Sequence, residues 1–198
     1  MSEGTAAPHV IVVAGPNGAG KSTTAPYLLR DTLEVAEFVN ADTIALGLSA
    51  FQPEAVAVTA GRIMLRRMRQ LAEARRDFAF ETTLAGRSLA PWIAGLKRRG
   101  FRVHLLYLWL ESADLAVSRV AERVRLGGHD VPELVIRRRY TKGLRNLFEL
   151  YMPLADGWQV FDNSHPTGPR PVAAGAGRDV HYVVDAGTWR MIVEAQRG

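Results

Sequence analysis

The 198-residue chain contains no cysteine. This absence excludes a disulfide framework, a thiolate nucleophile and any zinc site built on cysteine. No apolar run approaches the roughly 18 residues that a membrane-spanning helix needs. The N-terminal sequence MSEGTAAPH also lacks the charged and apolar regions of a signal peptide. We therefore expect a cytoplasmic protein with no membrane segment.

Lysine is scarce, because the chain has only 3 lysines beside 22 arginines, with a formal net charge of +5. A guanidinium group binds phosphate through paired donors, so such a chain could bind nucleic acid, a phosphorylated metabolite or an acidic protein. Biased genomic base composition would also enrich arginine on the surface, so charge alone identifies no ligand. With 47% hydrophobic and 23% charged residues, we expect one folded domain over residues 1–198.

Short β-branched or aromatic runs alternate with segments of helical periodicity along the chain. The predicted strands are 9–14, 35–39, 78–80, 103–110, 158–161 and 180–184, and helices are predicted between them. This alternation predicts an α/β three-layer domain with a mostly parallel sheet of five or six strands. Residues 166–177 are rich in proline, glycine and alanine, which predicts a surface loop.

A phosphate-binding loop follows the first predicted strand and precedes a predicted helix. Residues 15–22 read GPNGAGKS and match G-x-x-x-x-G-K-[ST] at every fixed position. The loop amides can curl around a phosphate, Lys21 can reach the β and γ phosphates, and Ser22 can ligate Mg²⁺. The predicted ATP-binding residues here are Gly15, Pro16, Asn17, Gly18, Ala19, Gly20, Lys21, Ser22 and Thr23.

Two large classes of nucleotide-binding protein are not supported by the remaining motifs. There is no N-K-x-D motif for guanine recognition and no LSGGQ-like signature of an ABC ATPase. The strand 103–110 is followed by a single carboxylate, Glu111, and then by serine. The remaining class is the kinases of small substrates, which need an acceptor-activating carboxylate, substrate contacts and a lid that carries arginines.

Polar side chains that could contact an acceptor follow the second and third predicted strands. Asp42 could orient or deprotonate a substrate hydroxyl, and the alternative is that it caps the following helix. Glu81, with Thr83 and Arg87, could face the substrate or the waters of a Mg²⁺ ion. The alternative for Glu81 is a carboxylate that accepts hydrogen bonds from backbone amides.

Residues 118–140 have the composition of a lid, with two arginine-bearing helices joined by a glycine hinge. Closure would bring guanidinium groups over the transferring phosphate and exclude water, and the alternative is a solvated basic helix face. The candidate arginines are Arg119, Arg123, Arg125, Arg137, Arg138 and Arg139. His129 lies in the hinge and could touch phosphate, but a lone histidine in a loop is interpreted as a surface or capping group. Asn163 follows a predicted strand in a loop that could contact adenine.

Together these segments resemble a small member of the zeta toxin family. The resemblance rests on GPNGAGKST, on NADTIA at 40–45, on FETTLAGRS at 80–88, on GGHDVPELVIRRRY at 127–140 and on NLFELY at 146–151. It implies a P-loop kinase fold, and an ATP-dependent phosphorylation of a hydroxyl of UDP-N-acetylglucosamine. It also implies that Lys21 and Ser22 serve the phosphates, that Asp42 activates the acceptor, and that Arg125 and Arg138 clamp ATP.

The leading hypothesis is therefore a small-molecule kinase that uses ATP and Mg²⁺, with a sugar nucleotide as the expected acceptor. An acidic antitoxin is a possible partner implied by the resemblance, whereas membrane and nucleic-acid partners are not expected. A kinase for another hydroxylated metabolite or an antibiotic is the first alternative. The second is a nucleotide-dependent binding module that transfers no phosphate.

Overall fold

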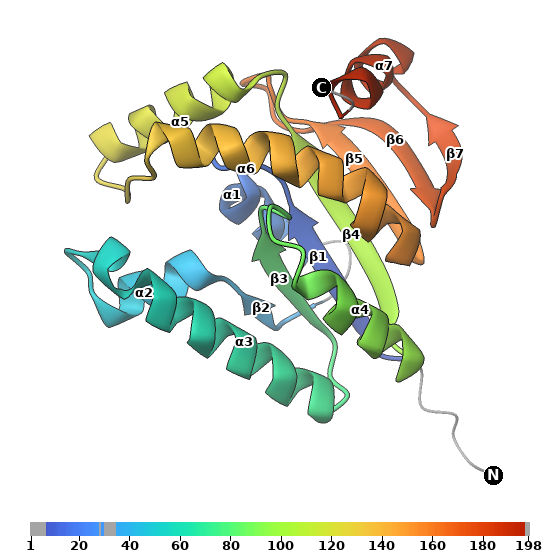
Figure 1. Cartoon of the computed structure of the whole chain (residues 1–198), viewed down its shortest axis with the longest axis horizontal. Helices are drawn as coiled ribbons and strands as arrows, with labels where there is room; N and C mark the ends of the chain where they lie inside the picture. The colour runs from blue at the N-terminus through green and yellow to red at the C-terminus, as the bar shows by residue number, and fades with distance from the viewer. Residues whose placement is uncertain (1–6, 28, 30–34, 197–198) are drawn as a thin grey trace.

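In the computed structural model, the described residues are 7–27, 29 and 35–196. Within this part of the chain seven strands form one sheet in the order β2-β3-β1-β4-β5-β6-β7 (Figure 1). The strands are β1 (His9–Ala14), β2 (Phe38–Val39), β3 (Phe78–Thr82), β4 (Arg102–Trp109), β5 (Gly157–Asp162), β6 (Arg170–Ala176) and β7 (Asp179–Val183). The first five pair in parallel, and β6 and β7 continue the sheet in antiparallel pairing. The predicted α/β fold with a mostly parallel sheet is confirmed, with more strands in the described chain than the five or six expected.

The additional strand is β6, and the prediction of a loop over 166–177 is wrong for most of this segment. The sequence RPVAAGA lacks the bulky alternation of a strand, but it pairs on both sides, with β5 and with β7. Pro171 is tolerated because a register shift lies beside it, where Val160 pairs with Ala173 and Phe161 pairs with Pro171. Gly175 is required because a Cβ there would overlap the indole of Trp158.

Helices lie on both faces of the sheet, which gives the predicted three layers (Figure 1). The α-helices are α1 (Lys21–Pro26), α2 (Ala41–Leu48), α3 (Ala57–Glu73), α4 (Leu89–Arg98), α5 (Ala113–Arg125), α6 (Glu133–Asn146) and α7 (Ala186–Ala195). Short turns are η2 (Pro53–Val56) before α3, and η3 (Leu147–Tyr151) and η4 (Met152–Leu154) after α6. Helix α6 is therefore followed directly by a π-helical turn, η3.

Successive side chains of a strand point to opposite faces of the sheet, which explains how both faces are buried. On one face, Val10 and Val12 of β1 pack in the core formed with α3, α4, α6 and α7. On the other face, Ile11 and Val13 pack against Ala25 and Leu29 at and beyond α1. Strand β1 is buried along nearly all its length, as expected for a central parallel strand.

The fold brings the carboxyl ends of β1, β2 and β3 to one edge of the sheet. Because β1 lies between β3 and β4, the chain turns to opposite sides of β1 at this edge, the usual ligand position in open α/β sheets. Helices α5 and α6 lie on one side of this edge and α2 and α3 on the other (Figure 1). Ser112 caps the N-terminus of α5, because its hydroxyl accepts a hydrogen bond from Leu115 N at 3.0 Å.

None of the described helices is long and apolar enough to span a bilayer. The prediction that the N-terminus is not a signal peptide concerns mainly residues 1–6, which lie outside the described residues. Leu28, which falls in the first predicted helix, also lies outside them.

Candidate functional site

The phosphate-binding loop connects β1 to α1, and its glycines are required by close backbone packing. Gly20, the residue before α1, has φ of 76°, which is the left-handed region that favours glycine. A Cβ on Gly20 would lie 2.8 Å from Asn163 Nδ2. Asn163 Nδ2 itself donates to Ala19 O at 2.8 Å, so the residue that follows β5 is hydrogen-bonded to the backbone of the loop. The structure thus places the Asn163 side chain against the backbone of the phosphate-binding loop, and its contact with adenine stays a prediction.

Lys21 is the first residue of α1 and its side chain is buried beneath the loop. Its ammonium group donates to Pro16 O at 2.8 Å and forms an ion pair with Glu81 Oε1 at 3.5 Å. Burial lowers the pKa of Lys21, and the charge of Glu81 only partly opposes this effect. The loop thus holds a desolvated cation where a nucleotide phosphate would lie.

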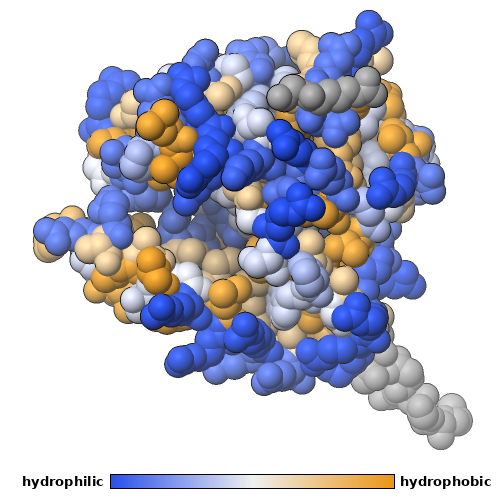
Figure 2. Space-filling view, in the orientation of Figure 1, coloured by the Kyte–Doolittle hydropathy of each residue, from blue (hydrophilic) through white to orange (hydrophobic). Residues whose placement is uncertain are grey.

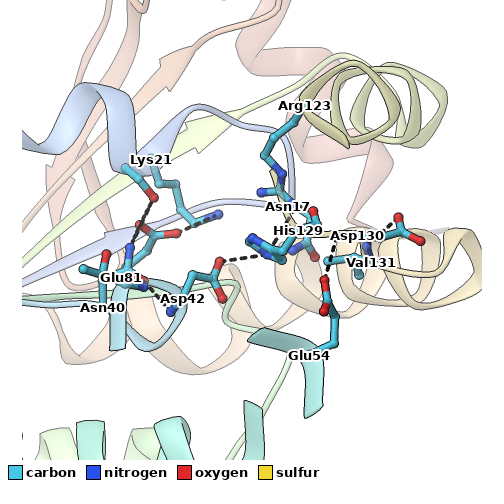
Figure 3. A network of polar contacts seen from close by, with 12 residues as sticks. Asn17, Lys21, Asn40, Asp42, Glu54, Glu81, Arg123, His129, Asp130 and Val131 are labelled. Carbon is cyan, nitrogen blue, oxygen red and sulfur yellow. Dashed lines mark hydrogen bonds and ion pairs between the residues drawn. The ribbon is translucent and has the colours of Figure 1, made fainter. Parts of the chain in front are cut away.

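Ser22, Asn40 and Glu81 converge from three elements. Ser22 Oγ donates to Glu81 Oε2 at 2.7 Å. Asn40 Nδ2 donates to the same oxygen at 2.7 Å, and Figure 3 shows Asn40 and Glu81 side by side. Asn40 Nδ2 also lies 3.2 Å from Ser22 Oγ. The hydrogen bonds of the Glu81 carboxylate in the described structure come from side chains, so the alternative of a carboxylate capped by backbone amides is not what the structure shows.

Asp42 lies in the first turn of α2, at the mouth of the site. Asn40, and not Asp42, caps this helix, because Asn40 Oδ1 accepts from Asp42 N at 2.7 Å and from Thr43 N at 3.3 Å. The capping alternative for Asp42 is therefore wrong, and its carboxylate stays available. Asp42 Oδ2 lies 3.3 Å from His129 Nε2, across from the opposite side of the site (Figure 3).

His129 belongs to the turn between α5 and α6 and joins the two sides of the site. Arg123 Nη2 donates to His129 O at 3.0 Å and lies 3.3 Å from His129 Nε2. Gly128 allows the turn to pack closely against the Arg123 side chain, because a Cβ on Gly128 would lie 2.5 Å from Arg123 Cγ. The interpretation of His129 as a surface group is wrong, since its side chain is 16% exposed and contacts Asp42.

Three of the six candidate arginines reach the site. A cavity of about 410 Å³ is lined by Lys21, Ser22, Asn40, Asp42, Glu81, Thr83, Arg119, Arg123 and Arg139, together with neighbouring loop residues. Arg125, Arg137 and Arg138 are not among its lining residues. Arg119 and Arg123 are four residues apart and therefore share one face of α5, from which Arg125 points away. Arg137 instead pairs with Asp114 and Glu133, and Arg138 is exposed.

The other predicted substrate residues separate into two groups. Glu81 and Thr83 line the cavity with Asp42, whereas Arg87 is not brought to it and lies 3.6 Å from Glu149 at the surface. The space-filling view shows a hollow between the side that carries α5 and α6 and the side that carries α2 (Figure 2). The site is therefore open to substrate from this face.

The sequence indicated the elements of the site but not every residue in it. Asn40 was not among the predicted site residues, although its side chain links Ser22 to Glu81. The sequence signal for Asn40 is its residue type together with its position. Asparagine is a preferred N-cap residue, and Asn40 directly precedes α2, two residues before Asp42. Arg119, Arg123 and Arg139 could have been selected only by knowing the rotation of α5 and α6.

Comparisons with known proteins support this fold. An uncharacterized protein of Haemophilus influenzae is 29% identical over 130 residues, which are 66% of this chain and 91% of that protein. The crystal structure of the AvrRxo1-ORF1:AvrRxo1-ORF2 complex with sulfate ions has a TM-score of 0.74 and 16% identity, and covers 96% of this chain. This chain spans 64% of the length of that AvrRxo1 chain, and a further structure of that complex contains ATP.

A structure from the PezAT chromosomal toxin-antitoxin system of Streptococcus pneumoniae has a TM-score of 0.64 and 16% identity. The alignment covers all of this chain and 81% of that chain. The resemblance to zeta toxins is thus confirmed at the level of the fold, since PezT is a zeta toxin. The profile of the AAA domain family matches residues 10–142, which contain the phosphate-binding loop, Asp42, Glu81 and the three arginines of the cavity. This match extends over more than half of the chain, so the protein belongs to the AAA domain family and has a P-loop kinase-like fold.

Proposed function

We propose that the protein is an ATP-dependent kinase that transfers the γ-phosphoryl group to a hydroxyl of a small molecule. The observation that carries this proposal is the convergence of Lys21, Asp42 and three arginines on one cavity of about 410 Å³. Phosphoryl transfer needs positioning and charge neutralisation more than covalent chemistry, and the side chains that line this cavity are of the kinds that could supply both.

The phosphate loop and Arg119 would position ATP. A second cavity of about 490 Å³ shares Gly20, Thr23 and Arg119 with the first, and it also includes Asn163. Arg119 is fixed there, because it donates to Asn163 O at 2.7 Å and to Ser164 O at 2.9 Å. We assign the adenosine of ATP to this cavity, with the γ phosphate directed toward Asp42.

The described residues fit a Mg²⁺ ion beside the phosphates. Mg²⁺ prefers oxygen ligands and usually keeps several waters, and the hydroxyl of Ser22 and the carboxylate of Glu81 lie 2.7 Å apart at the end of the loop. Ser22 would hold the ion and Glu81 would orient its waters. When bound, Mg²⁺ would neutralise charge on the β and γ phosphates.

Asp42 would orient the acceptor hydroxyl and accept its proton. The carboxylate lies where the phosphate cavity opens to the outside and is 48% exposed, so a bound acceptor can reach it. Arg123 and Arg139, one from each helix of the lid at 118–140, would stabilise the charge of the transferred phosphoryl group. The lid would also exclude water, which otherwise competes as an acceptor.

The zeta toxin resemblance makes a sugar nucleotide such as UDP-N-acetylglucosamine the first acceptor to test. Another hydroxylated metabolite or an antibiotic is the second class, and a binding module without phosphoryl transfer is the alternative function. An acidic antitoxin is the proposed protein partner, because the zeta toxin resemblance implies one and a similar structure comes from a toxin-antitoxin system.

The proposal is tested by incubating the protein with ATP, Mg²⁺ and a panel of sugar nucleotides, amino sugars and hydroxylated antibiotics, followed by ³¹P NMR and mass spectrometry. A phosphorylated acceptor should form with the wild type and disappear in Lys21→Ala and in Asp42→Asn, while Asp42→Asn still binds ATP. ATP binding without any phosphorylated acceptor, and slow ATP hydrolysis that Asp42→Asn leaves unchanged, would favour the binding module.

A further inference from the structure

The backbone of the turn between α5 and α6 determines where His129 lies. Gly127 follows the last turn of α5 with φ of 87°, in the left-handed region that favours glycine. Gly127 N donates to Val124 O at 2.9 Å, and Gly128 N donates to Arg123 O at 2.9 Å. These two hydrogen bonds form a Schellman motif, which reverses the chain at the end of the helix. The next residue, His129, is thereby directed back into the cleft, where its side chain is largely buried.

Two contacts cross the cleft at neighbouring residues of this turn. His129 Nε2 lies 3.3 Å from Asp42 Oδ2 on α2, and Asp130 N donates to Glu54 Oε1 on η2 at 3.3 Å (Figure 3). On its own side of the cleft, His129 is fixed by Arg123, whose Nη2 donates to the His129 carbonyl oxygen at 3.0 Å. The turn therefore joins the lid to the opposite wall, and His129 makes the contact that involves the proposed proton acceptor.

The Asp42 carboxylate has one oxygen engaged and the other open to a ligand. Oδ2 contacts His129, and within the described residues no other hydrogen bond or ion pair reaches this side chain. Because the carboxylate is 48% exposed, contact with a fixed ring restricts a rotation that water would otherwise allow. A carboxylate only accepts hydrogen bonds, so this contact requires a proton on His129 Nε2. Arg123 Nη2 also lies 3.3 Å from Nε2, and the His129 carbonyl oxygen gives it an acceptor when Nε2 carries the proton.

We infer that His129 is a positioning residue of the reaction: Nε2–H donates to Asp42 Oδ2 and leaves Oδ1 for the acceptor hydroxyl. The inference rests on the kinase function proposed above. In that reaction the hydroxyl gives its proton to Oδ1, its oxygen bonds to the γ phosphorus, and ADP leaves with the electrons of the broken P–O bond. A displacement of about 1 Å can lower a rate by about 100-fold, so His129 can act on transfer without touching the substrate.

The kinetic test compares three substitutions of His129 in the transfer assay with the acceptor panel. His129→Ala removes the donor, His129→Gln keeps an N–H group near the place of Nε2, and His129→Asn carries the same amide on a shorter side chain. His129→Ala and His129→Asn should lower kcat by about 10- to 100-fold and leave KM for ATP within about 2-fold. His129→Gln should restore kcat to within about 5-fold of the wild type, because its amide reaches Asp42.

A distance measurement tests the contact without any phosphoryl transfer. The chain has no cysteine, so Val58→Cys on α3 and Leu134→Cys on α6 place one pair of nitroxide labels at exposed positions on opposite walls of the cleft. Double electron–electron resonance should give a narrow distance distribution, which His129→Ala broadens. Asp42→Ala should broaden it equally, and the two substitutions together should add nothing, because they remove one contact. His181→Ala, on the exposed strand β7, is the matched control and should change neither kcat nor the distances.

The two measurements separate failure of this inference from failure of the kinase function. The inference is overturned if the wild type phosphorylates an acceptor and His129→Ala has the same kcat, if the loss appears only in KM for ATP, or if His129→Asn restores kcat as well as His129→Gln. Unchanged label distances in His129→Ala would also overturn it. Absence of transfer in the wild type would contradict the kinase proposal, and broadened distances in His129→Ala would then still support the contact with Asp42.

Discussion

Ser22 Oγ donates a hydrogen bond to Glu81 Oε2 at 2.7 Å, which joins the first turn of α1 to the end of β3. The other oxygen of this carboxylate lies 3.5 Å from Lys21 Nζ. One carboxylate therefore contacts both the proposed Mg²⁺ ligand and the phosphate-binding lysine. These two contacts are the basis for the role proposed for Glu81.

Glu81→Gln is expected to lower both transfer and apparent Mg²⁺ affinity by about 10- to 100-fold, the usual effect of losing a group that orients a metal ligand. The amide keeps the size of the side chain but cannot neutralise Lys21. Kinetic titration of Mg²⁺ at saturating ATP measures the effect. An unchanged Mg²⁺ dependence would mean that Glu81 does not orient the ligands of the ion and only pairs with Lys21.

Two pairs of lid arginines give opposite expectations. Alanine at Arg123 or Arg139, which line the phosphate cavity, is expected to lower kcat by about 10³-fold, because each would stabilise the transferred charge. Alanine at Arg125 or Arg138, which do not line it, is expected to change kcat by less than about 3-fold. Steady-state kinetics of the four variants decide between the geometry and the assignment that the zeta toxin resemblance implies.

Arg123 and Arg125 also show where the sequence could and could not predict the site. The phosphate loop and β1 were predictable, because a local motif between a buried strand and a helix determines them. The choice between arginines depends on how α5 and α6 are rotated against the sheet, which their spacing does not fix. Strand β6 was missed for a similar reason, since pairing with β5 and β7 and packing under Trp158 define it.

Gly143 is predicted to be intolerant of a side chain. It lies buried in α6, where a Cβ would overlap the carbonyl oxygen of Thr83, one of the residues that line the phosphate cavity. Gly143→Ala is expected to destabilise the fold by about 1–3 kcal/mol, because the backbones must move apart. Gly61→Ala is the control: Gly61 lies in α3 and a Cβ added there would meet no neighbouring atom within 4 Å, so alanine should stabilise by roughly 0.5–1 kcal/mol. Urea denaturation of both variants measures the difference, and equal effects would contradict the proposed clash.

Asp156 is expected to make stability depend on pH. Burial raises the pKa of its carboxyl, but the hydrogen bond from Val103 N at 2.8 Å and the ion pair with Lys97 at 3.0 Å outweigh burial and hold the pKa below its ordinary value. A carboxyl with a lowered pKa in the folded state stabilises the fold when ionised, and this contribution is lost as the pH falls from about 4 through the folded pKa.

Asp156→Asn should therefore destabilise the protein by about 1 kcal/mol at pH 7, where the wild type keeps its charged hydrogen bonds. The difference between the two proteins should shrink as both are brought toward pH 3, since the wild-type carboxyl then becomes neutral as well. Urea denaturation at pH 7, 5, 4 and 3 measures it, and the comparison cancels the titration of all other groups. A difference that stays constant over this range would mean that Asp156 acts through the shape of its side chain and not through its charge.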